Sequence, residues 1–148
     1  MPRNKIIPPT PACFVIHLQV KEPDVNYAGH VGNERYPLFA QEARLAFLKS
    51  LGCTELKFGA YGIILAETHI EYLTELFIDE SIEVHLSITA PTRVAFECYC
   101  QVKTNREGKF VIAANIRSNM VCFDYKERKV KSIPEEIKSL LLSAAQIN

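Results

Sequence analysis

The segment Glu34–Leu51 constrains the fold more than any other part of the chain. Its apolar residues recur at helical spacing, as at Phe39, Ala43 and Phe47, and further leucines lie on the remaining faces. Gly52 stands where such a helix would end. We therefore predict one long helix that is apolar nearly all round and buried on more than one side.

The rest of the chain alternates between apolar and polar residues with a period of two, which indicates half-buried strands. The predicted strands are Cys13–Lys21, Ile63–Leu73, Ser81–Thr89, Val94–Thr104 and Phe110–Tyr125. Asn105–Gly108 is typical of a hairpin turn, Arg128–Ile133 extends or caps the sheet, and Pro134 opens a short final helix. Because one helix cannot cover both faces of a sheet, we expect an α+β fold in which a curved antiparallel sheet wraps the helix.

Length and composition fit one domain, because the chain has 148 residues of which 48% are hydrophobic. We expect residues 1–12, with three prolines between positions 8 and 11, to be a flexible lead-in to a single domain over 13–148. The formal net charge of zero gives no sign of nucleic acid, and no apolar run approaches the roughly 18 residues of a membrane span. The five cysteines show neither zinc spacing nor a small disulfide framework, so we expect reduced thiols and a cytoplasmic protein.

The stretch "DVNYAGHVGNERY" at residues 24–36 crowds small and polar residues just before the apolar helix. With the order of elements, it resembles the hotdog-fold acyl-CoA thioesterases, in particular the 4-hydroxybenzoyl-CoA thioesterase-like group. The residues that carry the resemblance are Asp24, Gly29, His30, Val31, Asn33 and Tyr36. Weaker support comes, in the expected order, from "EAR" at 42–44, "IEYLTEL" at 70–76 and "DESIEV" at 79–84.

The resemblance implies a hotdog fold and hydrolysis of an acyl-CoA thioester without a metal or other cofactor. It implies a homodimer or homotetramer with sites at the subunit interface. From the charge and the lack of an apolar span we expect no nucleic-acid or membrane partner. No G-x-S-x-G elbow or Gly-rich phosphate loop competes with this interpretation.

The resemblance also implies site residues. The polar stretch would cross the reacting thioester, and small residues such as Gly29 and Gly32 would let the backbone approach it closely. A backbone N–H near Gly32–Asn33, at the start of the helix, would polarise the thioester carbonyl. Asp24 and Tyr36 belong to the same motif, and Arg93 lies where the family contacts the phosphates of coenzyme A.

The chain departs from the family at Asn26, where the motif usually carries a catalytic acid. A neutral amide can neither attack a thioester nor take a proton, so another residue has to replace that acid. The alternative function is a non-hydrolytic acyl-CoA or acyl-carrier binding protein that has lost the acid.

Three residues are candidates for the missing base. His30 is a candidate because an ordinary imidazole is a suitable base near neutral pH, although His30 could instead hold the shape of the loop. Glu67 shares a strand face with His69 and Glu71, which is equally the pattern of a solvent-exposed face. Glu42 lies on the apolar helix, about one turn beyond the position at which another hotdog subgroup places its acid. Of these candidates we rank His30 first, and Asp24 is a further candidate that could instead cap the loop.

Overall fold

The computed structural model describes residues 5–145 of the chain. Its elements are β1 (Phe14–Gln19), η1 (Glu22–Asp24), η2 (Asn33–Arg35), α1 (Tyr36–Ser50), β2 (Gly62–Tyr72), β3 (Ser81–Ile88), β4 (Ala95–Arg106), β5 (Lys109–Asp124), β6 (Lys129–Val130) and α2 (Glu135–Ala145). η1 and η2 are single turns of 3-10 helix, and η2 runs directly into α1. Each predicted strand and both predicted helices are present, with bounds that differ by a few residues.

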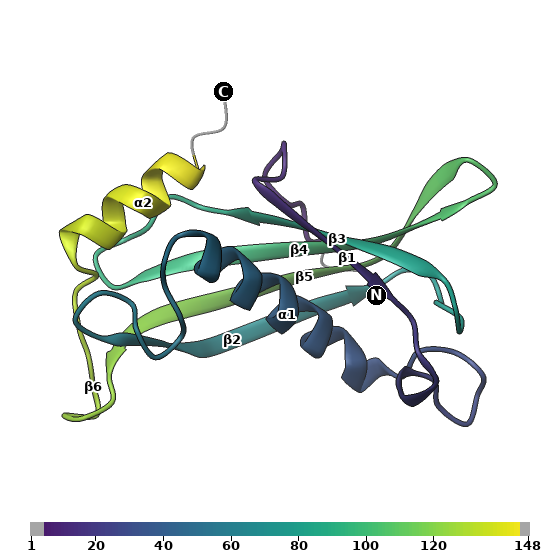
Figure 1. Ribbon diagram of the computed structural model, residues 1–148, viewed down its shortest axis with the longest axis horizontal. Helices are drawn as coiled ribbons and strands as arrows, with labels where there is room; N and C mark the ends of the chain where they lie inside the picture. Colours follow the sequence, from purple (N-terminus) through teal and green to yellow (C-terminus); the bar gives the residue numbers. More distant parts are fainter. Residues whose placement is uncertain (1–4, 146–148) are drawn as a thin grey trace.

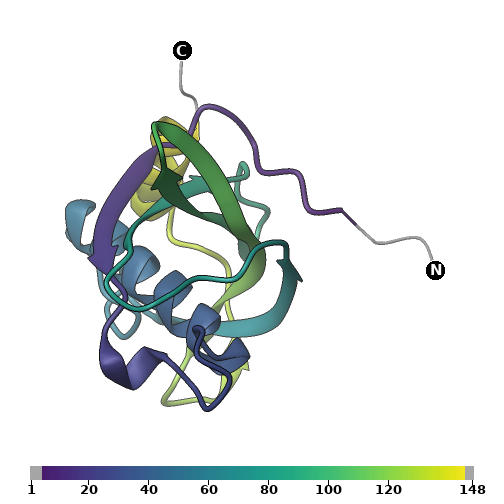
Figure 2. The ribbon, with the colours of Figure 1, turned by 90° about the vertical axis from the view of Figure 1, so that its right-hand side faces the viewer.

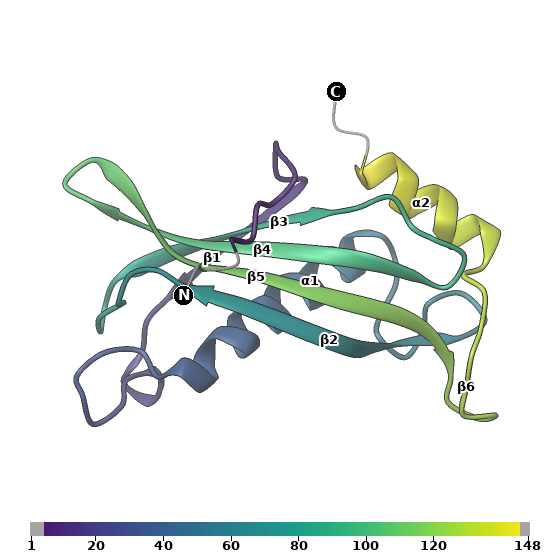
Figure 3. The ribbon, with the colours of Figure 1, turned by 180° about the vertical axis from the view of Figure 1, so that it is seen from behind.

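One antiparallel sheet contains all the strands, in the order β1-β3-β4-β5-β2, with the short β6 added to β5. The strands β1 and β2 form its two edges, and Figure 1 shows β2 at the edge beside β5. Viewed along the strands, the sheet curves around α1 (Figure 2), and from behind the strands lie in front of the helix (Figure 3). A long helix wrapped by a curved antiparallel sheet is the predicted hotdog architecture, which is confirmed.

The hairpin between β4 and β5 is also as predicted. Its two loop residues, Glu107 and Gly108, have φ values of 55° and 80°. Two successive positive φ values match the twist of the flanking strands in a tight hairpin, and glycine adopts such a value at little cost. The side chain of Asn105 closes the turn by accepting a hydrogen bond from Gly108 N at 3.0 Å.

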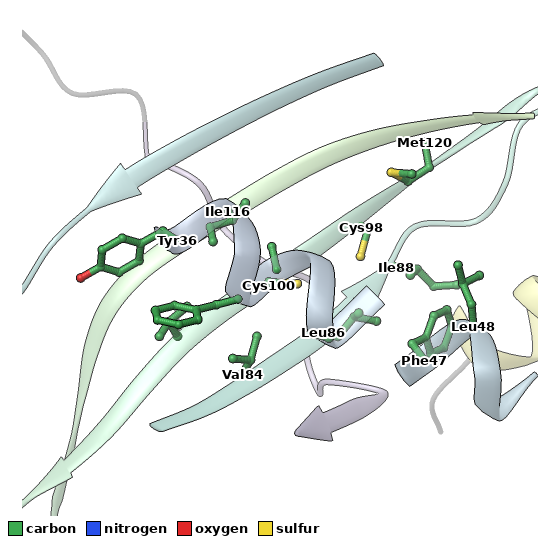
Figure 4. Packing of buried hydrophobic residues seen from close by; sticks show 14 of the residues in the cluster. Tyr36, Phe47, Leu48, Val84, Leu86, Ile88, Cys98, Cys100, Ile116 and Met120 are labelled. Atoms are coloured by element: carbon green, nitrogen blue, oxygen red, sulfur yellow. The ribbon is translucent and has the colours of Figure 1, made fainter. Parts of the chain in front are cut away.

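The core lies between α1 and the concave face of the sheet (Figure 4). Phe47 and Leu48 of α1 face alternate residues of β3 and β4, because a period of two places every second strand residue on the same side. Cys98 and Cys100 are among these buried strand residues, and all five cysteines are free, as predicted.

The outer side of α1 differs from the prediction. Leu48 is fully buried, but Leu38 and Leu45 are 41% and 40% exposed in the single chain. The sheet covers one side of the helix, so the apolar residues on the other side stay partly exposed. The helix is therefore buried on one side only within one chain.

The segment before β1 lies across the convex face of the sheet. Ile6 is buried and its N–H donates to Oε1 of Glu71 at 3.3 Å, while Ser87 Oγ donates to the carbonyl of Pro9 at 2.8 Å. Glu71 is consequently buried, although its strand neighbours Glu67 and His69 are exposed as their pattern suggested. Residues 1–4 of the expected lead-in lie outside the described residues.

Candidate functional site

The polar stretch before α1 folds as a small hairpin. Val25 and Val31 form an isolated antiparallel bridge, and Asn26 N donates to the His30 carbonyl at 2.9 Å. Gly29 has a φ of 83°, a left-handed conformation that favours glycine. The loop therefore needs Gly29 for its backbone shape, and the space beside its Cα is open.

Asp24 is buried and stabilises this loop through hydrogen bonds. One carboxylate oxygen accepts from Arg35 Nε at 3.0 Å and Nη2 at 2.9 Å, and the other accepts from Lys21 N at 2.9 Å. The Asp24 carbonyl also accepts from Gly32 N at 3.0 Å. Because Asp24 is buried and both of its oxygens are bonded, its carboxylate holds the shape of the loop, and Asp24 also lines a groove of about 860 Å³ beside α1.

The start of the helix offers two free donors. Gly32 N is already bonded to Asp24, but neither Asn33 N–H nor Glu34 N–H has an acceptor among residues 5–145. The first amides of a helix carry a partial positive charge, which α1 reinforces because η2 continues into it. The predicted carbonyl-binding position near Gly32–Asn33 is therefore available at Asn33 and Glu34.

Two tyrosines support this turn. Tyr72, at the end of β2, donates from its hydroxyl to the Asn33 carbonyl at 3.1 Å, and its ring packs edge-on against Tyr36. Tyr36 is only 3% exposed, so it is a core residue that holds the start of α1. Burial raises the pKa of Tyr36 to about 12. Burial also raises the pKa of Tyr72, with a further contribution from the charge of Glu34.

Asn26 and His30 both bond within the loop. The Asn26 side chain accepts from Ala28 N at 2.9 Å, which makes it part of the turn. Nδ1 of His30 lies 3.0 Å from the Val31 carbonyl. A carbonyl only accepts hydrogen bonds, so Nδ1 is the donor, and in the neutral ring Nε2 then has the lone pair. The geometry thus allows His30 to shape the loop and still act as a base.

The other predicted site residues lie outside this loop. Glu42 points from the exposed side of α1 into a groove of about 860 Å³ next to β1 and β3. Glu67 is on the convex face, 3.7 Å from His69 Nε2, and lines a separate hollow of about 350 Å³. Arg93 donates to Ser132 Oγ at 2.8 Å in the connection before β4. That connection and the loop are at opposite ends of the sheet (Figure 1).

Sequence reasoning missed Glu34. Its carboxylate folds back over Gly32, and a Cβ added to Gly32 would lie 2.6 Å from Glu34 Oε2 and 2.8 Å from Glu34 Cδ. The acid therefore lies against the peptide that carries one of the free donors. Its position directly after Asn33 was a signal in the sequence. An acid in a turn, however, lies on no periodic face of a strand or helix, so periodicity does not indicate it.

Within residues 5–145, no three His, Cys, Asp or Glu side chains are grouped so that they could hold a metal ion. The helices of this part of the chain are also too short or too polar to cross a membrane.

The sequence model of the thioesterase-like superfamily matches residues 20–141. A protein of Aquifex aeolicus (strain VF5) named "Putative esterase" is 31% identical over 131 residues, which are 86% of this chain and 97% of the relative.

Two solved structures share the fold. A 1,4-dihydroxy-2-naphthoyl-CoA thioesterase from Synechocystis superposes with a TM-score of 0.77 at 20% identity, over 87% of this chain and 95% of its own. A Staphylococcus aureus protein solved in complex with CoA has a TM-score of 0.81 at 18% identity, over 97% and 89% of the two chains.

Proposed function

Because the chain belongs to the thioesterase-like superfamily, we propose that it hydrolyses an acyl-CoA thioester to a free acid and CoA. The observation that carries this proposal is the pair of free amides at Asn33 and Glu34. A thioester carbonyl in front of them accepts hydrogen bonds that strengthen as negative charge develops on its oxygen. The CoA complex of the Staphylococcus aureus neighbour supports CoA as the thiol carrier.

The fold suggests how the rest of the site is built. β2 is an edge strand with β5 on one side only, so its other side can pair with a second copy. Antiparallel pairing of two β2 edges brings the Arg93 end of one subunit toward the loop end of the other. In such a homodimer Arg93 can meet the phosphates of a CoA whose thioester lies at Asn33. A homotetramer would be formed from two such pairs.

A screen of acyl-CoA hydrolysis tests the proposal. Short, long and aromatic acyl-CoAs are incubated with the protein, and the free thiol of CoA is measured. We expect release well above the uncatalysed rate for at least one acyl class. Saturable binding without release would instead support the alternative of a non-hydrolytic binding protein, which the neutral Asn26 favours.

A further inference from the structure

The thioester site lacks a carboxylate at position 26, and the structure places another one beside the carbonyl-binding amides. We infer that Glu34 is the general base that activates water in this site. The inference rests on the proposed thioester hydrolysis and names a residue for a step that the hydrolysis requires.

The position of the Glu34 carboxylate is the first observation. The carboxylate occupies the space beside Gly32 Cα in which any other residue would carry its side chain. A Cβ built on Gly32 would lie 2.6 Å from Glu34 Oε2 and 2.8 Å from Glu34 Cδ. Gly32 has a φ of −69° and a ψ of 149°, which every residue adopts readily, so its backbone does not require glycine. The lack of a side chain at position 32 is instead what gives the carboxylate its place.

The surroundings of Glu34 are the second observation. The adjacent Arg35 is bonded to Asp24 at 2.9 Å, so this cation is already paired. The Tyr72 hydroxyl donates to the Asn33 carbonyl, and the charge of Glu34 contributes to the raised pKa of Tyr72. The carboxylate, this hydroxyl and the free Asn33 amide therefore belong to one small region at the start of η2.

The chemistry follows from that arrangement. The Glu34 carboxylate takes a proton from water while the water oxygen bonds to the thioester carbon, and the carbonyl electrons move onto the oxygen in front of the Asn33 amide. When the intermediate collapses, the carbon–sulfur bond breaks and the proton held by Glu34 passes to sulfur. One thioester and one water give one carboxylic acid and one thiol, and Glu34 returns to its starting form.

The main test compares three variants in the CoA-release assay. Glu34→Gln keeps the size of the side chain but cannot take a proton, and we expect its kcat to fall roughly 10²–10⁴-fold, as for loss of a general base. Glu22→Gln is the matched control, because it removes an exposed negative charge near the same loop, and its kcat should stay close to that of the wild type. His30→Gln tests the rival base, and it should lose much less than Glu34→Gln.

Two outcomes overturn the inference in different ways. If the wild type releases CoA and Glu34→Gln releases it equally fast, Glu34 is not the base although the proposed function stands. If the wild type releases no CoA from any acyl-CoA, the proposed function and the role of Glu34 fail together.

A second experiment addresses the position of the carboxylate. A methyl group in Gly32→Ala displaces the flexible end of Glu34, so we expect kcat to fall while the protein stays folded. The pKa of the Tyr72 phenol, followed by NMR of its ring, should fall in both Gly32→Ala and Glu34→Gln, because the first moves a nearby negative charge away and the second removes it. An unchanged Tyr72 pKa in Glu34→Gln would show that the carboxylate is not where the inference requires it.

Discussion

At the scale of single residues, the two glycines of the loop have different roles. Gly29 has a left-handed φ of 83° with open space around it, whereas Gly32 has an ordinary φ of −69° and faces Glu34. Gly29→Ala should therefore lose about 1 kcal/mol of unfolding free energy, because a side chain disfavours the left-handed region. Gly32→Ala should lose less stability and more activity. Urea unfolding of both variants measures their stability, and the CoA-release assay measures their activity. A Gly29→Ala protein as stable as the wild type would contradict the prediction.

At the scale of elements, the stability of the fold depends on the side of α1 that faces the sheet. Leu48 is fully buried, and Leu45 on the same helix is 40% exposed. Leu48→Ala should cost about 2–5 kcal/mol of unfolding free energy, because it loses apolar burial and leaves a cavity. Leu45→Ala is the matched control and should cost far less. Equal losses in denaturant titrations of the two variants would mean that the packing of α1 is not as described.

The order of these elements could be predicted from the sequence, because the periods of two and 3.6 are local properties. The exposure of Leu38 could not, since it depends on which side of the helix the sheet leaves open. The burial of Glu71 depends on Ile6, which is distant in the sequence and carries no periodic signal.

The candidate site could be predicted only in part, because some of its features depend on contacts between residues and not on a local pattern. The motif located the helix start at Asn33, but the burial of Asp24 and Tyr36 comes from contacts with Arg35 and the core. The position of the Glu34 carboxylate depends on the rotamer of Glu34 and on the missing side chain at position 32. The periodicity and spacing of residues in the sequence do not indicate this rotamer.

At the scale of the whole molecule, several groups favour the neutral form in the folded state. Burial raises the pKa of Cys13 from 9.0 to about 11 and that of Tyr36 from 10.0 to about 12. Burial also raises the pKa values of Cys53 and Cys122, and the hydrogen bond with Cys100, together with burial, raises that of Cys98. Their contribution to stability is complete below the pKa values of the unfolded chain. It is lost as pH rises toward the folded values, because only the unfolded chain then releases these protons.

Stability should therefore fall as pH rises from 9.0 toward about 12. Urea unfolding across this range measures the fall. Tyr36→Phe, which cannot ionise, should make it shallower above the ordinary tyrosine value of 10.0. An identical pH dependence in Tyr36→Phe would show that this tyrosine does not contribute.

The assembly is the second prediction at this scale. The unpaired edge of β2 and the exposed Leu38 and Leu45 are surfaces that a second copy can cover. We expect sedimentation to show a dimer or a larger oligomer at micromolar concentration. A monomer under these conditions would contradict both the pairing through β2 and the placement of Arg93 in a shared site.

The central claim is that the Asn33 amide polarises the thioester carbonyl, and one substitution removes that amide alone. Asn33→Pro deletes the N–H at the first position of η2, where a helix tolerates proline, and Gly32 already has the extended ψ of 149° that proline requires before it. Its kcat for CoA release should fall roughly 10²–10³-fold, as when one oxyanion donor is removed, while Asn33→Ala, which keeps the N–H, should lose far less. If Asn33→Pro stays folded and releases CoA as fast as Asn33→Ala, the carbonyl does not bind at this amide.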